Sequence, residues 1–287
     1  MAETTAGRTS EDRDVVVALE DVGVRRHTNG QVILSEIDWT VRAGEHWVLL
    51  GANGAGKTTL LKLLGAQMHP TTGSVEVLGC RLGRVDVREL RTRIGHVSSA
   101  QAVPKDVDSR TVVLTGHSGT VQPLWRTYDD EVRDRADALL AELGVKELAH
   151  RPYAVCSGGQ RARILIARAL MPAPALLLLD EPFNALDLPS REDLVEAMQR
   201  LAESRPDLAT VTVTHHLEEL FPAAGHALLL REGRILVGGP VGGVLTAPWM
   251  TACFGRPVRV VRHDGRWAAY SGSLAGERAD IAAEATW

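Results

Sequence analysis

Short, mainly hydrophobic runs alternate along this chain with longer stretches whose hydrophobic residues recur at helical spacing. The hydrophobic runs are 46–50, 176–179 and 208–213, and the helical stretches are 58–67, 129–143 and 191–202. Runs of this length that end at polar or Gly-rich loops are typical of strands buried on both faces of a sheet. Because such strands alternate with amphipathic helices, we predict an α/β fold with a mostly parallel sheet covered on both faces.

The pattern changes toward both ends of the chain. Residues 15–20 and 22–26 predict two strands, and residues 227–237 and 257–270 predict hairpins. The expected organisation is a disordered tail (1–14), one large domain (15–250) with a mainly helical part (about 100–165), and a C-terminal hairpin extension with its tail (251–287).

Composition narrows the class of protein. The 287 residues are 45% hydrophobic and 24% charged, which is typical of globular proteins. Thirty-two basic and 36 acidic residues give a net charge of −4, so we expect no direct nucleic acid binding. Cys80, Cys156 and Cys253 form no CxxC pair, which predicts neither a disulfide framework nor a zinc site and favours a reducing cytosol.

One segment is long enough to raise the question of a membrane span. Residues 235–255 carry no formal charge, but they are interrupted by Gly238, Gly239, Gly242, Gly243 and two prolines. Such breaks would leave backbone groups unpaired in lipid. We therefore expect a turn-rich soluble segment, and contact with a membrane only through a partner.

The segment GANGAGKT at 51–58 matches the phosphate-loop motif GxxxxGK[ST] between a predicted strand and a predicted helix. In such a loop backbone amides converge on phosphates, Lys57 neutralises the β and γ phosphates and the Thr58 hydroxyl binds Mg²⁺. The alternative is a Gly-rich turn with an unrelated lysine. The expected ligands of ATP are Gly51, Ala52, Asn53, Gly54, Ala55, Gly56, Lys57, Thr58 and Thr59.

Two carboxylates follow the hydrophobic run 176–179. Asp180 and Glu181 stand where a parallel sheet places its ligands. We expect Asp180 to hold Mg²⁺ and Glu181 to accept the proton of an attacking water. The alternative is an acidic helix cap after a core strand.

The segment Cys156-Ser157-Gly158-Gly159-Gln160 resembles the LSGGQ signature of ATP-binding cassette (ABC) ATPases. Residues 184–187 resemble the D-loop of that family and His215 its switch histidine, so that the resemblance spans about residues 17–245. It implies a P-loop NTPase with a RecA-like core, an N-terminal antiparallel β subdomain and an inserted helical subdomain.

The resemblance also implies roles for individual residues. Ser157, Gly158, Gly159 and Gln160 would reach the ATP of a second cassette arranged head to tail, as a homodimer or heterodimer. Asp187 would belong to the same interface. His215 would contact the γ-phosphate and position the water.

Three positions depart from the family pattern. Cys156 replaces a leucine, which we interpret as packing. Arg26 stands where many cassettes have an aromatic residue that stacks on adenine, so a guanidinium would stack there or the residue is simply solvated. Ser99 occupies the place of the Q-loop glutamine, and Gln101 is the candidate for that catalytic and Mg²⁺-binding role.

The resemblance therefore implies an ATPase subunit that powers a membrane ABC transporter through ATP-dependent dimerisation. It would bind a permease from the cytoplasmic side of the cell membrane, with Leu124, Trp125 and Tyr128 either facing the permease or packed in the core. The variants at 97–99, 214–219 and 253–258 resemble molybdate- or iron-chelate-related cassettes. The His215-His216 pair lacks a third metal ligand nearby.

Two other classes of protein fit less well. Soluble cassettes that act on ribosomes or DNA carry two cassettes or long coiled coils, whereas only 100 residues separate Lys57 from Ser157. A P-loop kinase of small molecules would leave the signature and His215 unexplained.

Overall fold

The computed structural model describes residues 14–26, 28–98, 101–104 and 106–272. The tail expected over 1–14 lies outside these residues except for Asp14, as do Ser99 and the end of the chain from residue 273. Everything that follows concerns the described residues.

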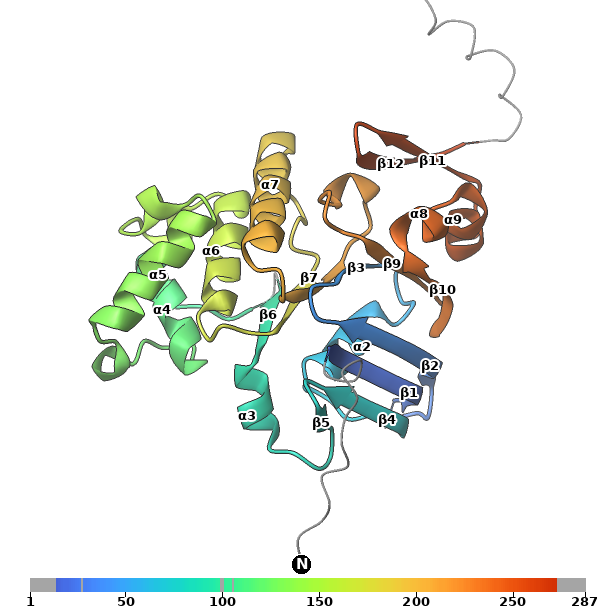
Figure 1. Ribbon diagram of the computed structural model, residues 1–287, viewed down its shortest axis with the longest axis horizontal. Helices are drawn as coiled ribbons and strands as arrows, with labels where there is room; N and C mark the ends of the chain where they lie inside the picture. Colours follow the sequence, from blue (N-terminus) through green and yellow to red (C-terminus); the bar gives the residue numbers. More distant parts are fainter. Residues whose placement is uncertain (1–13, 27, 99–100, 105, 273–287) are drawn as a thin grey trace, which may run out of the picture.

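A six-stranded sheet runs through the middle of the molecule (Figure 1). Its strands are β3 (His46–Leu50), β6 (Ile94–Ser98), β7 (Leu176–Asp180), β8 (Ala209–Val213), β9 (His226–Arg231) and β10 (Arg234–Pro240). They lie in the order β10-β9-β3-β8-β7-β6. All neighbours are parallel except β9 and β10, which form a hairpin. The prediction of a mostly parallel sheet in an α/β fold is confirmed.

Strand β7 shows why the runs are so uniformly hydrophobic. Leu177 and Leu179 belong to one hydrophobic core, whereas Leu176 and Leu178 belong to another, and all four side chains have no exposed area. Successive side chains of a strand point to opposite faces. A strand covered on both sides therefore needs an apolar residue at every position.

Helices cover one face of the sheet. These are α4 (Ser109–Ser118), α5 (Asp130–Glu142), α6 (Gly158–Leu170) and α7 (Leu188–Ser204). In Figure 1, α4, α5 and α6 gather beyond the β6 edge, and α7 stands between them and the C-terminal elements. Within this helical part Tyr128 is buried, while Leu124 and Trp125 are 45% and 54% exposed. Tyr128 is thus a core residue, and its hydroxyl accepts a hydrogen bond from the amide of Leu124 at 3.1 Å.

The other face packs against α2 (Lys57–Leu64) and a second sheet of order β2-β1-β4-β5. Its strands are β1 (Val15–Arg25), β2 (Val32–Arg42), β4 (Thr72–Val77) and β5 (Cys80–Arg81), and α3 (Val87–Thr92) leads from it into β6. The neighbouring strands of this sheet are antiparallel.

Two predicted boundaries were wrong. The strands expected over 15–20 and 22–26 are one strand, β1, because Asp21 adopts φ 46° in a bulge instead of ending the strand. The helix expected over 58–67 ends at Leu64, because Gly65 closes it and Ala66 turns to φ 51°.

The C-terminal elements follow β10. They are α8 (Val241–Val244), α9 (Ala247–Phe254), β11 (Val258–His263) and β12 (Arg266–Ser271), the last two forming an antiparallel hairpin. The uncharged segment 235–255 is divided among β10, α8 and α9. Across the described part of the chain, every helix is too short or too polar to cross a bilayer.

Candidate active site

Three loops meet at one edge of the six-stranded sheet because they follow neighbouring parallel strands. Residues 51–56 follow β3, Thr214 and His215 follow β8, and Glu181 follows β7. The carboxyl ends of parallel strands are where α/β sheets place their ligands. The order β3-β8-β7 therefore brings together the phosphate loop, the switch histidine and the acidic pair of the sequence analysis.

The phosphate loop leads directly into the N-terminus of α2. Gly56, which precedes Lys57, adopts φ 107°, and a Cβ at this position would approach Cδ2 of Leu34 to 2.6 Å. Only glycine fits this backbone without strain. Ala52, Asn53 and Gly54 are exposed. The loop thus exposes its backbone to solvent at a helix N-terminus, a geometry that favours the binding of phosphate.

The Lys57 side chain folds back across this loop. Its Nζ donates hydrogen bonds to the carbonyl oxygens of Gly51 at 2.8 Å and Ala52 at 3.0 Å. Burial lowers the pKa of Lys57, and the negative charges of Glu181 and Asp180 partly oppose this effect. The ammonium group is therefore held on the loop close to both carboxylates.

Asp180 and Thr58 provide oxygen atoms of the kind that magnesium prefers. Burial raises the pKa of Asp180, the charge of Glu181 adds to the effect, and Lys57 opposes it. Thr58 lies exposed in the first turn of α2. A carboxylate and a hydroxyl are hard ligands that suit Mg²⁺ beside phosphates. A divalent cation would also offset the repulsion between the two neighbouring carboxylates, so these residues fit the predicted metal.

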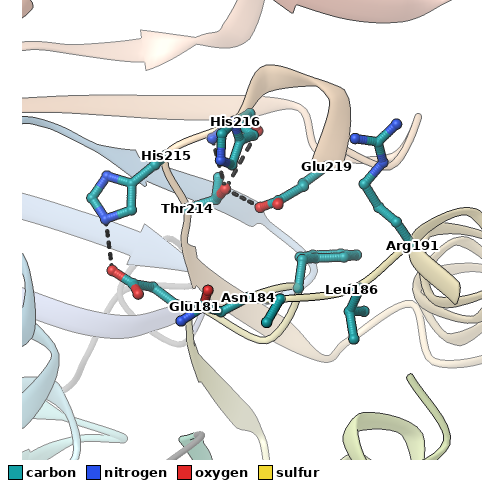
Figure 2. Close-up of a pocket in the computed structure, with 10 residues that line it drawn as sticks. Glu181, Asn184, Leu186, Arg191, Thr214, His215, His216 and Glu219 are labelled. Carbon is teal, nitrogen blue, oxygen red and sulfur yellow. Dashed lines mark hydrogen bonds and ion pairs between the residues drawn. The ribbon is translucent and has the colours of Figure 1, made fainter. Parts of the chain in front are cut away.

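Glu181 and His215 contact each other directly. The Nε2 of His215 lies 2.6 Å from the Oε1 of Glu181. Figure 2 marks this contact with a dashed line. Glu181 adopts φ 52°, a left-handed conformation that is uncommon outside glycine. Because of this turn, the carboxylate of Glu181 is not in line with that of Asp180. The amide of Glu181 donates to the carbonyl oxygen of Val213 at 3.1 Å. The contact between Glu181 and His215 fixes the direction of both side chains.

The sequence analysis missed the polar residues behind this pair. Thr214 donates to the buried carboxylate of Glu219, and its hydroxyl accepts from the amide of His216 at 3.0 Å (Figure 2). Burial raises the pKa of Glu219. A cavity of about 170 Å³ lies between these residues, Glu181 and Arg191. Its signal in the sequence is the segment 214–219, which the predictions used for its histidines and for a subgroup resemblance but not for Thr214 or Glu219 as site residues.

The signature residues form a helix N-terminus. Ser157 is the N-cap of α6, and its side chain accepts from the amide of Gln160 while the Gln160 side chain accepts from the amide of Ser157. This reciprocal capping box leaves Ser157 and Gly158 exposed. Cys156 is buried, and its Sγ lies 3.6 Å from the hydroxyl of Ser109, as the interpretation of packing requires.

The D-loop lies against the signature. A Cβ at Gly159 would come within 2.7 Å of the Cβ of Ser190, and one at Gly158 within 3.1 Å of Leu186. Asp187 is the N-cap of α7, and its carboxylate accepts from the amide of Ser190 at 3.0 Å. Hydrogen bonds from the Ser190 side chain and then from this amide lower the pKa of Asp187. The starts of α6 and α7 thus form one surface.

One expected ligand lies elsewhere. Gln101 lines a separate cavity of about 180 Å³ with Gly95, His96 and Arg168, toward the amino end of β6. Its Oε1 is buried and has no hydrogen-bond partner among the described residues. The structure therefore does not bring Gln101 to Asp180 and Lys57. Arg26 is exposed at the end of β1.

Comparison with known proteins identifies the family. The family model described as "ABC transporter" matches residues 34–184. An uncharacterized ABC transporter ATP-binding protein of Bacillus subtilis, YlmA, is 39% identical over 256 residues, covering 88% of this chain and 96% of that protein. The hemin import ATP-binding protein HmuV of Rhodococcus jostii is 35% identical over 251 residues, covering 86% of this chain and 83% of the relative.

A solved structure described as an inward-facing conformation of a putative metal-chelate type ABC transporter shares the fold. Its TM-score is 0.73 at 26% identity, over 91% of this chain and 99% of that one. Together with the phosphate loop and the signature, these matches show that the chain belongs to the ATP-binding cassette family of ABC transporter ATPases.

Proposed function

We propose that this chain binds and hydrolyses Mg·ATP at the site described above, and that a pair of such cassettes powers transport by a membrane permease. The observation that carries the proposal is the 2.6 Å contact between Glu181 and His215 at the sheet edge that also holds the phosphate loop. A carboxylate held by an imidazole beside a phosphate site is suited to accept a proton from water.

In this proposal the chain holds the triphosphate through its loop and the start of α2. Lys57 would leave the loop carbonyls and pair with the β and γ phosphates, and Arg26 would lie nearest the adenine. Asp180 and Thr58 would hold Mg²⁺, which neutralises phosphate charge when it is bound. The residues that would surround the phosphates are Gly51, Ala52, Asn53, Gly54, Ala55, Gly56, Lys57, Thr58 and Thr59.

The hydrolytic step would depend on the Glu181–His215 pair. Glu181 accepts a proton from the attacking water, and its contact with His215 fixes the carboxylate in one direction. The same imidazole would also contact the γ-phosphate. A base that is already oriented needs no rearrangement at the moment of reaction.

The signature would act on a second cassette. Ser157, Gly158 and Gln160 cap an exposed helix N-terminus, whose dipole favours an anion. Their packing partners belong to the D-loop rather than to the phosphate loop of the same chain. Two chains arranged head to tail would place this helix, together with Gly159 and Asp187, on the ATP of the partner cassette.

The tip of the helical part would contact the permease. Val121, Leu124 and Trp125 are exposed there, at 43%, 45% and 54%. Exposed hydrophobic groups of this size often mark protein interfaces. The name of the hemin import relative supports an import system, in which this chain would lie at the cytoplasmic face of the cell membrane.

Substitution of the proposed base tests the catalytic part of this function. Glu181→Gln should slow ATP hydrolysis by about 10²-fold or more, because the amide cannot accept the proton. ATP affinity measured by calorimetry should stay close to that of the wild type. Glu196→Gln, a substitution at an exposed position of α7, is the matched control and should leave turnover unchanged. Normal hydrolysis by Glu181→Gln would exclude Glu181 as the base.

A further inference from the structure

Arg266 of the C-terminal hairpin binds two segments that lie beside the catalytic site. Arg266, the first residue of β12, donates from Nη1 and Nη2 to the two carboxylate oxygens of Glu192 at 2.7 and 3.2 Å. Its Nη2 also donates to the carbonyl oxygen of Glu218 at 2.6 Å. One guanidinium therefore joins three elements: the hairpin, helix α7, and the short 3₁₀ helix η4 (Leu217–Glu219).

Each anchored residue lies close in sequence to a functional loop. Glu192 is five residues beyond Asp187, which begins α7 at the D-loop. Glu218 is three residues beyond His215. The Arg266 guanidinium holds the pKa of Glu192 below its usual range, as expected of a bidentate ion pair. These contacts of Arg266 with Glu192 and Glu218, here called the Arg266 clamp, therefore tie the start of α7 to the segment that follows the switch histidine.

Residues 214–219, here called the switch segment, are also held by hydrogen bonds of their own. Thr214 donates to the carboxylate of Glu219 and accepts from the amide of His216 (Figure 2). His215 thus lies in a short loop closed by Thr214 and Glu219, with Arg266 holding the middle of η4. With both ends held, the imidazole has few orientations other than the one that meets Glu181.

We propose that Arg266 is a positioning residue for ATP hydrolysis, which holds the switch segment 214–219 against α7 and thereby keeps His215 on Glu181. This inference rests on the proposed function. It gives the C-terminal hairpin a role in turnover, although no residue of the hairpin lines the cavity beside Glu181 and His215.

The hairpin has packing contacts besides those of Arg266. Val258 donates its amide to the hydroxyl of Thr251 in α9 at 3.0 Å. Val258, Val260, Trp267 and Ala269 pack against the larger hydrophobic core. Loss of the Arg266 side chain should therefore release η4 while the hairpin remains in place.

Steady-state kinetics of full-length variants test the proposal. Arg266→Ala should lower kcat for ATP by about tenfold with KM within about twofold, because binding is kept and only alignment is lost. Arg266→Lys keeps the positive charge but cannot bind both carboxylate oxygens as the planar guanidinium does, and it should lose less activity than Arg266→Ala. Arg262→Ala, on the same hairpin, removes a cation–π contact with Trp267 and should leave turnover unchanged. Equal kcat for wild type and Arg266→Ala would overturn the inference.

A double-mutant cycle separates positioning from general stability. If Arg266 acts through His215, Arg266→Ala should have little further effect in a His215→Ala background, whereas independent effects would multiply. Glu192→Gln is a second variant that weakens the clamp from α7 and should reproduce part of the loss in kcat. A positioning role would be contradicted if the effects of the two substitutions on kcat multiplied. It would also be contradicted if the loss of kcat only paralleled a fall in melting temperature. A wild-type chain without ATPase activity would instead overturn the proposed function, and this inference with it.

Discussion

At the scale of single residues, the charge of Asp180 is costly before any cation binds. Burial and the neighbouring Glu181 raise its pKa, so the folded chain favours the protonated carboxyl more than the unfolded chain does. The stabilisation that protonation brings is present below the ordinary pKa of an aspartate, about 4, and is lost as pH rises through the raised value. At neutral pH the folded protein therefore carries an electrostatic penalty at this residue.

Asp180→Asn should remove that penalty. Without nucleotide or Mg²⁺, we expect the variant to melt about 1–3 °C above the wild type at pH 7, with the difference shrinking as the pH falls toward 4. Thermal unfolding followed by circular dichroism from pH 4 to 8 measures this. Asp207→Asn, at an exposed position, is the control and should show no such trend. A lower melting temperature for Asp180→Asn at pH 7 would contradict the electrostatic account.

At the scale of elements, the close approach of α6 and α7 couples the signature to the D-loop. Gly159 is buried, and a Cβ there would lie 2.7 Å from the Cβ of Ser190. Gly159→Ala should therefore cost about 1–3 kcal/mol through overpacking, against a gain of up to about 1 kcal/mol in helix propensity. Denaturant unfolding measures the net loss.

Gly242→Ala is the matched control for this change. Gly242 lies in α8, and a Cβ there would meet no atom within 4 Å. We expect it to be neutral or slightly stabilising. Equal changes in stability for Gly159→Ala and Gly242→Ala would mean that α6 and α7 can move apart at no cost in free energy.

The elements also show how far the sequence alone could lead. The buried strands and the P-loop were predictable because a strand covered on both faces must be apolar throughout, and because the loop motif is local in sequence. The single strand β1 was not, since Asp21 is held in its bulge by strands that pair from both sides. The Arg266 clamp joins residues 48 and 74 positions apart, which no local pattern encodes. Gln101 was assigned by spacing, and the structure places it in another cavity.

At the scale of the whole molecule, the proposed function assigns the phosphate loop and the signature of one chain to different ATP sites. Residues 51–58 lie at the carboxyl edge of β3, whereas Ser157 caps an exposed helix that packs on the D-loop. In the proposed dimer, an ATP site would be complete only when a second cassette supplies its signature. Bound ATP would favour the closed pair because each nucleotide contacts both subunits, and hydrolysis would remove that preference.

This arrangement predicts a nucleotide-dependent dimer. Glu181→Gln with Mg·ATP should be dimeric by light scattering and monomeric without nucleotide, because the slow variant keeps the ATP that joins the two subunits. Adding Ser157→Arg to Glu181→Gln should abolish the dimer, since it places a bulky side chain at the helix N-terminus that faces the partner. Gln122→Arg, at an exposed position in the helical part, is the matched control and should leave the dimer intact. A chain that binds Mg·ATP yet stays monomeric at about tenfold its cellular concentration would exclude the homodimer and require a different cassette as the partner.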